Sequence, residues 1–152
     1  MFVFFSIFYQ DVKTRYVHVL LFPAIALLAG FVHYSKTIYP VFLYNIGFNF
    51  LVTLTILGIL FLYSKLVLKS PFLNHTFGLG DLLLFAALSV AFPVYTFIIL
   101  FVFSILFSMV IHPLFKSGST QPTLPLAGYM SLFFALVFLI NIFFGYPKLY
   151  DI

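Results

Sequence analysis

The stretch "FLNHTFGLGDLLLFAAL", residues 72–88, decides the fold and raises the question of function. It places an aspartate, Asp81, directly after a Gly-Leu-Gly turn and at the start of a long apolar run. If that run lies in lipid, an ionisable group there costs about 2.5–3.5 kcal/mol on insertion scales. An acid kept at such a position is therefore a candidate functional residue.

Composition shows which kind of protein carries this run. The chain has 152 residues, of which 64% are hydrophobic and only 7% are charged. A soluble domain of this size has about a quarter charged residues, so this chain has too few polar side chains to cover a globule in water. Its long apolar runs lack the alternation of barrel strands, and backbone in lipid must be paired internally. We therefore expect an all-α integral membrane protein, with about six transmembrane helices in a single domain.

Charged residues, prolines and glycines divide the chain into the expected helices, which cover residues 2–11, 17–33, 41–63, 79–92, 94–114 and 124–144. Six crossings separate the basic residues into two groups. The larger group is Lys13, Arg15, Lys65, Lys69 and Lys116, and the smaller one is Lys36 and Lys148. Because basic loops stay in the cytoplasm, the larger group predicts the cytoplasmic side and an N-terminus outside. The net charge of +4 is thus interpreted as topology information, and no nucleic-acid partner is expected.

The acidic residues are few and informative. Glutamate is absent, and Asp151 lies next to the C-terminus, so only Asp11 and Asp81 remain for the membrane region. Both are expected near the cytoplasmic side at similar depth. Two carboxylates that share a site tend to hold one proton between them, which makes an acid–base pair. The alternative is that each aspartate caps a helix, or that Asp11 pairs with Lys13 or Arg15.

Other residue types narrow the chemistry. Gly78 and Gly80 permit positive φ and a close backbone approach, which suits a carboxylate that must meet an extended peptide. The segment fails as a phosphate loop, because no strand precedes it and neither Lys nor Ser/Thr follows. The absence of cysteine excludes disulfides, thiolate zinc sites and cysteine nucleophiles. The histidines fall in different segments without an i, i+4 pair, so neither a metal nor another cofactor is expected.

Three motifs carry a resemblance to a known family. "DVKTRYV" (residues 11–17) and "GLGD" (78–81) resemble the motifs of the type IV prepilin peptidases, aspartic membrane proteases related to the archaeal preflagellin peptidases. "LPLAGYM" (124–130) resembles a third, proline-rich element near the start of the last helix. The resemblance implies that Asp11 and Asp81 are catalytic and that the two glycines support them. It also implies a supporting role for Pro125, Leu126 and Ala127.

The same resemblance implies a substrate and a location. The expected substrate is a pilin-like precursor with a short basic leader ahead of a hydrophobic helix. Its leader would be cut at the cytoplasmic face of the bacterial inner membrane. The chain resembles the peptidase half alone, without the zinc-binding N-terminal domain, so we expect cleavage without N-methylation. The oligomeric state stays open.

One departure from the family pattern leaves two alternative functions open. The family usually has lysine two positions after the second aspartate, where this chain has Leu83, which is expected to keep the site less polar. One rival is a catalytically silent relative that binds pilin-like helices. The other is a small proton-coupled carrier that uses the aspartates as a relay, although such carriers have inverted repeats and the sequence has none.

The sequence supports less specific predictions for a few other polar residues. His75 is close enough in sequence to Asp81 to be a partner of that carboxylate. Asn45 and Asn49 are one helical turn apart, so interhelical hydrogen bonding is favoured over substrate contact. The loop cations, Lys13 and Arg15 among them, would not attract a basic leader and are expected to serve topology and lipid headgroups.

Overall fold

The computed structural model describes residues 1–69, 77–115 and 125–150. Its elements are the helices α1 (Phe2–Thr14), α2 (Leu21–Lys36), α3 (Tyr39–Tyr63), α4 (Leu79–Ala91), α5 (Val94–Phe115) and α6 (Leu126–Phe144), with a π-helical turn at Ser64–Leu68 after α3. The predicted all-helical class is confirmed for these ranges. Three helices, α3, α5 and α6, are long and apolar enough to cross a membrane, whereas α2 and α4 are shorter apolar helices.

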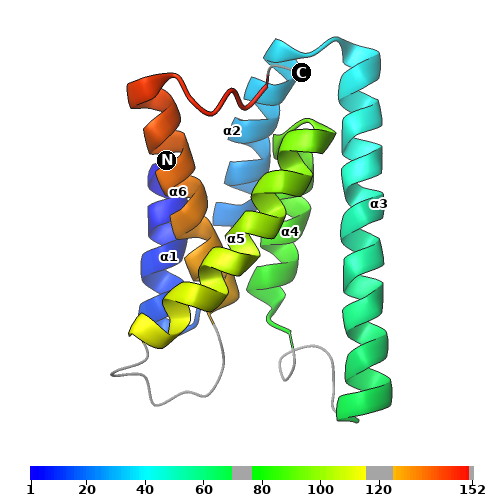
Figure 1. Ribbon diagram of the computed structural model, residues 1–152, viewed down its shortest axis with the longest axis vertical. Helices are drawn as coiled ribbons and strands as arrows, with labels where there is room; N and C mark the ends of the chain where they lie inside the picture. Colours follow the sequence, from blue (N-terminus) through cyan, green and yellow to red (C-terminus); the bar gives the residue numbers. More distant parts are fainter. Residues whose placement is uncertain (70–76, 116–124, 151–152) are drawn as a thin grey trace.

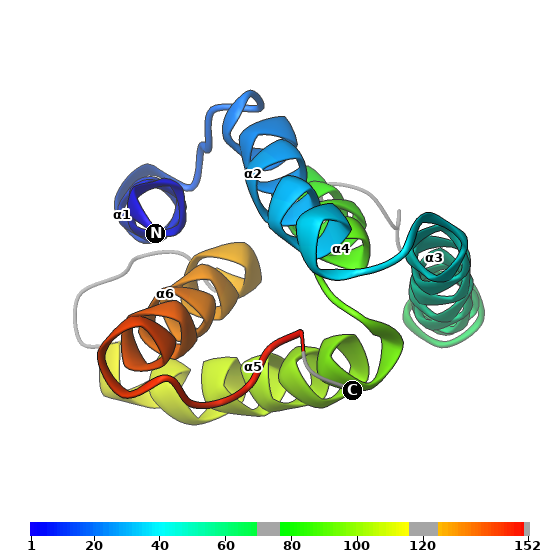
Figure 2. The same cartoon turned by 90° about the horizontal axis from the view of Figure 1, so that it is seen from above.

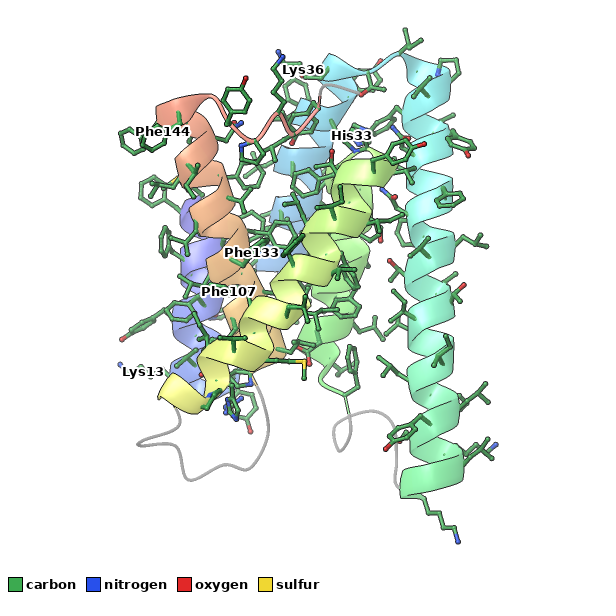
Figure 3. All side chains as sticks on the ribbon, in the orientation of Figure 1. Lys13, His33, Lys36, Phe107, Phe133 and Phe144 are labelled. Atoms are coloured by element: carbon green, nitrogen blue, oxygen red, sulfur yellow. The ribbon has the colours of Figure 1, made fainter. Side chains whose placement is uncertain are left out.

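The helices are packed side by side, and successive helices run in opposite directions (Figure 1). Seen from above, α1 lies beside α6 and α2 lies beside α4, while α3 stands at the edge of the bundle (Figure 2). Lys13 and Lys36 lie at opposite ends of the bundle (Figure 3). This arrangement puts the end of α1 and the start of α4 at the same end of the molecule (Figure 1).

The first helix is longer than its predicted range of 2–11. The predicted C-terminal end at residue 11 is wrong. α1 continues to Thr14, because residues 12–14 contain no helix breaker and the Thr14 hydroxyl donates to the carbonyl oxygen of Gln10 at 2.8 Å. Arg15 then ends the helix with a left-handed backbone at φ 60°. Asp11 therefore lies inside the helix, about one turn before its end.

The second helix starts later than the predicted residue 17. The backbone N–H of His18 donates to Oε1 of Gln10 at 2.9 Å, which holds this segment against α1. α2 then begins at Leu21, and Pro23 falls in its first turn, where proline is tolerated because its missing N–H has no intrahelical partner.

Aromatic rings fill the centre of the bundle. Phe4 of α1 and Phe92 at the end of α4 both stack against Phe134 of α6, with ring centroids 5.8 and 5.7 Å apart. Phe107 of α5 contacts Phe133 of α6 at 5.4 Å (Figure 3). Rings bury large areas and hold their neighbours in defined orientations, so this core ties α1, α4, α5 and α6 together.

The C-terminal end of α4 is stabilised by side chains of two other helices. The last carbonyl groups of a helix have no partner within it, and Ser89, Ala91 and Phe92 are buried, so these groups need partners from elsewhere. Asn49 of α3 donates through Nδ2 to the carbonyl oxygens of Ser89 (3.0 Å) and Phe92 (2.8 Å). Nδ1 of His33, from α2, contacts the carbonyl oxygen of Val90 at 3.0 Å.

A second set of contacts completes this polar cluster. Nδ2 of Asn45 lies 3.2 Å from Nε2 of His33, and the hydroxyl groups of Thr53 and Ser89 lie 2.8 Å apart. An accepting Nε2 leaves Nδ1 of a neutral imidazole to donate to Val90. The predicted interhelical hydrogen bonding of Asn45 and Asn49 is confirmed, and His33 lies at the bundle end opposite Lys13 (Figure 3).

Candidate active site

Two acidic side chains from distant parts of the chain meet at the start of α6. Oδ2 of Asp11, on α1, accepts the backbone N–H of Gly128 at 2.6 Å. Oδ1 of Asp81, on α4, accepts the backbone N–H of Ala127 at 2.6 Å. Because these two N–H groups belong to consecutive residues of α6, they bring the two carboxylates together at the start of that helix.

The start of α6 suits this task because of where its donors lie. The first N–H groups of a helix have no partner within the helix, and the aligned peptide dipoles make this end partly positive. Pro125 forms the N-cap, and the donors of Ala127 and Gly128 follow in the first turn. All three residues are buried. The carboxylates thus complete a buried helix end that would otherwise have unsatisfied donors.

Asp81 is also fixed within its own helix. It lies in the first turn of α4, and its Oδ2 accepts the backbone N–H of Gly78, the N-cap residue, at 3.3 Å. Asp81 therefore uses both carboxylate oxygens, whereas Oδ1 of Asp11 makes no hydrogen bond with the described residues. Both carboxylates are only partly buried, so the pair is reachable from outside the bundle.

Two glycines leave room for these carboxylates. A Cβ atom on Gly128 would lie 2.9 Å from Oδ2 and 3.0 Å from Cβ of Asp11. A Cβ atom on Gly78 would lie 3.0 Å from Oδ2 of Asp81. Such separations are shorter than ordinary van der Waals contact. A side chain at either glycine would therefore push against an aspartate.

Neither Gly78 nor Gly80 uses the positive φ that glycine permits. Gly78 has φ −74° and ψ 143°, an extended backbone open to any residue, and Gly80 is part of α4. A Cβ atom on Gly80 would meet the Phe22 ring at 3.6 Å and Cβ of Ala127 at 4.0 Å, which are ordinary contacts. Of the two, Gly78 is the glycine whose small size matters to Asp81.

Comparison with known protein families identifies the chain. The type IV leader peptidase family matches residues 1–113, most of the sequence. The chain belongs to the type IV leader peptidase family. Members of this family are proteases of the leader-peptidase kind, and this class is therefore assigned to the chain. Together with the apolar helices, membership also indicates a multi-pass membrane protein. No curated protein and no solved structure matches the chain.

In this leader peptidase the family match ends before α6 begins. It covers both aspartates but not the residues that hold them, Ala127 and Gly128. The sequence indicates this segment through "LPLAGYM": the N–H of Ala127 contacts Asp81, and Pro125 is the N-cap of the same helix. It did not indicate that backbone N–H groups are the contacting atoms. The available signal was a proline followed by small residues at the start of an apolar run, as at a helix N-terminus.

The other predicted site residues are two leucines and a histidine. Leu126 and Leu83 are partly buried and pack against the hydrophobic core. His75 lies outside the described residues. His33 and His112 lie on different helices, so the structure does not bring these two histidines together.

A buried tyrosine borders the site and was not singled out from the sequence. Tyr129 follows Gly128 in α6, and its side chain is 3% exposed. Its ring contacts Phe8 of α1 at 6.4 Å between centroids and His112 of α5 at 6.0 Å. Tyr129 thereby ties the end of α5 to the helix that carries Asp11.

Proposed function

We propose that this chain is an aspartic endopeptidase that removes the leader peptide of type IV prepilin-like precursors. The observation that carries the proposal is the pair of bonds from Ala127 and Gly128 to Asp81 and Asp11. These bonds tie the two carboxylates to adjacent N–H groups of one helix, an arrangement that suits a pair sharing one proton. Membership of the leader peptidase family supports the same reaction class.

The reaction uses one proton held between the carboxylates. The ionised aspartate takes a proton from a water molecule, and the resulting hydroxide attacks the carbonyl carbon of the scissile peptide bond. The neutral aspartate donates a hydrogen bond to the carbonyl oxygen as negative charge develops on it. The C–N bond of the tetrahedral intermediate then breaks as the leaving nitrogen receives a proton from the pair, which returns the pair to its singly protonated state. Oδ1 of Asp11 makes no hydrogen bond with the described residues, so it is available to accept a proton from the water.

The site fits a location at the cytoplasmic face of a bacterial inner membrane. In this arrangement all six helices cross the bilayer and the N-terminus lies outside. The shortness of α4, about 20 Å against roughly 30 Å of hydrocarbon, leaves Asp81 below the cytoplasmic surface. The substrate then enters as an extended leader from the cytoplasm while its hydrophobic helix stays in lipid. No methylation step belongs to this proposal.

Cleavage of a pilin-type precursor by the purified protein in detergent tests the function. Asp11→Asn and Asp81→Asn should each reduce the rate by at least about 10³-fold, since neither variant retains an acid–base pair. The asparagine oxygen can still accept the N–H of Gly128 or Ala127, so both variants should fold. Lys13→Gln, which changes an exposed cation on the same helix as Asp11, is the matched control and should cleave normally.

Two outcomes would contradict the proposal. Near-normal cleavage by Asp11→Asn or Asp81→Asn would remove that residue from the catalytic pair. A folded wild-type protein that binds the precursor without cutting it at any pH would instead support the silent relative.

A further inference from the structure

An apolar groove lies between α1 and α2, toward the end of the bundle where α1 begins. Its volume is about 150 Å³. The buried residues Phe4, Ile25 and Ala29 line it, and so does Leu28, whose side chain is 62% exposed. The groove is therefore open on the outer surface of the bundle. An apolar cavity of about this volume can hold a benzene-sized group, so the groove has room for one large apolar side chain.

The groove lies on the seam between two packed pairs of helices. α1 packs against α6 and α2 packs against α4, whereas α1 and α2 touch each other much less (Figure 2). Asp11 belongs to the first pair of helices and Asp81 to the second, and they meet at the start of α6. The two carboxylates and the groove therefore lie on the same seam.

Both walls of the groove lead to the carboxylates. On α1, Phe4 lies about two helical turns before Asp11 and on the same face of the helix. On α2, Ile25 lies about one turn after Phe22. The Phe22 ring is next to the first turn of α4, since a Cβ atom on Gly80 would lie 3.6 Å from it. Each wall thus extends from the aspartate pair to the groove.

This alignment suits the precursor that the enzyme is proposed to cut. The scissile peptide bond must lie at the aspartates, while the hydrophobic helix that follows it stays in lipid. A helix that leaves the aspartates along the seam reaches the groove after roughly 10 Å, which corresponds to about seven residues. An acyl chain of a lipid would also be apolar, but its binding requires no alignment with the aspartates.

We propose that the groove between α1 and α2 binds the hydrophobic helix of the precursor, about seven residues beyond the bond that is cut. This proposal rests on the proposed function of the chain. One large apolar side chain of the helix enters the groove between Phe4 and Ile25. The groove does not touch the reacting atoms, so it contributes to KM for the precursor and not to the chemical step.

A comparison of two substrates tests this docking site. One is the complete precursor, and the other is a short peptide that ends about three residues beyond the scissile bond, too soon to reach the groove. Leu28→Trp, which places a larger ring at the groove, should raise KM for the complete precursor about tenfold or more and leave kcat nearly unchanged. It should not change KM for the short peptide.

Leu27→Trp is the matched control for Leu28→Trp. Leu27 is the preceding residue of α2 and is 74% exposed, but it does not line the groove. The control variant should therefore cleave both substrates like the wild type. Both leucines are exposed, so neither substitution disturbs the core of the bundle.

Disulfide cross-linking gives a second readout that needs no turnover. The chain has no cysteine of its own, and an Asp81→Asn background keeps the precursor uncut. In that background, Leu28→Cys should form a disulfide with a single cysteine placed about five to nine residues beyond the scissile bond. Leu27→Cys should form little.

The results that contradict the docking site differ from those that contradict the function. Equal KM values of Leu28→Trp and Leu27→Trp for the complete precursor would overturn the docking site, as would equal cross-linking at the two positions. Loss of a bound phospholipid in Leu28→Trp would then assign the groove to an acyl chain, and loss of a dimer would assign it to a second copy of the chain. A wild type that cleaves neither substrate would contradict the proposed function itself.

Discussion

The backbone N–H of Gly128 donates to Oδ2 of Asp11 at 2.6 Å, across 117 positions of the sequence. The same glycine leaves no room for a side chain, because a Cβ atom there would lie 2.9 Å from that oxygen. Gly128 thus has two functions at one point: its N–H group holds the carboxylate, and its missing side chain lets the carboxylate approach.

Gly128→Ala should therefore impair cleavage strongly. The added methyl group must displace Asp11, and a displacement of about 1 Å at a reacting group can cost roughly 10²-fold in rate. Gly58→Ala is the matched control, since a Cβ atom on Gly58 meets nothing within 4 Å. Cleavage rates of the two variants, measured at equal amounts of folded protein, provide the comparison. Equal activity of Gly128→Ala and Gly58→Ala would show that cleavage does not depend on the contact between Asp11 and Gly128.

Gly78 and Gly80 should differ, although both belong to the same motif. Gly78→Ala places a methyl group 3.0 Å from Oδ2 of Asp81, so we expect about a tenfold loss of cleavage rate. Gly80→Ala meets only ordinary contacts and should stay within about threefold of the wild type. If Gly80→Ala were instead the more damaging change, the motif would need its second glycine for a reason other than space.

The fold was largely predictable from the sequence because membrane helices have few alternatives. Length, apolar runs and the sparse charges set the helix number and order, and "GLGD" marked the start of α4 within a residue. The sequence predicts the end of α1 too early, because the polar residues of "DVKTR" resemble a break between helices. Its residues are compatible with a helix, and the true end depends on the left-handed turn at Arg15 and on the contact between Gln10 and His18.

The partners of the aspartates were harder to predict. Hydrogen bonds from backbone N–H groups have no residue type of their own, so Ala127 and Gly128 carry little signal beyond their small size. Asn45 and Asn49 were predictable, because their spacing of one turn places both on the same face of α3.

Asn49→Leu should destabilise the protein while leaving the site chemically intact. Asn49 supplies two hydrogen bonds to the last carbonyl groups of α4, and leaving these buried acceptors unsatisfied costs about 2–4 kcal/mol of unfolding free energy. Thr55→Val is the control, because Thr55 is exposed and its hydroxyl contacts only Leu51 of its own helix. Thermal unfolding in detergent should show a clearly lower midpoint for Asn49→Leu alone. Equal midpoints would mean that the hydrogen bonds from Asn49 of α3 do not stabilise the C-terminal end of α4.

The orientation of the bundle can be tested with single cysteines, because the chain has none of its own. Tyr16 follows the end of α1 and Ser35 lies near the end of α2, and both are exposed at opposite ends of the bundle. With the larger group of basic residues in the cytoplasm, Tyr16→Cys should react in intact cells only with a membrane-permeant maleimide. Ser35→Cys should react with an impermeant maleimide as well. The reverse pattern would put the aspartates near the outer face, where a cytoplasmic precursor could not present its leader. Labelling of both cysteines by the impermeant reagent would mean that α2 does not cross the membrane.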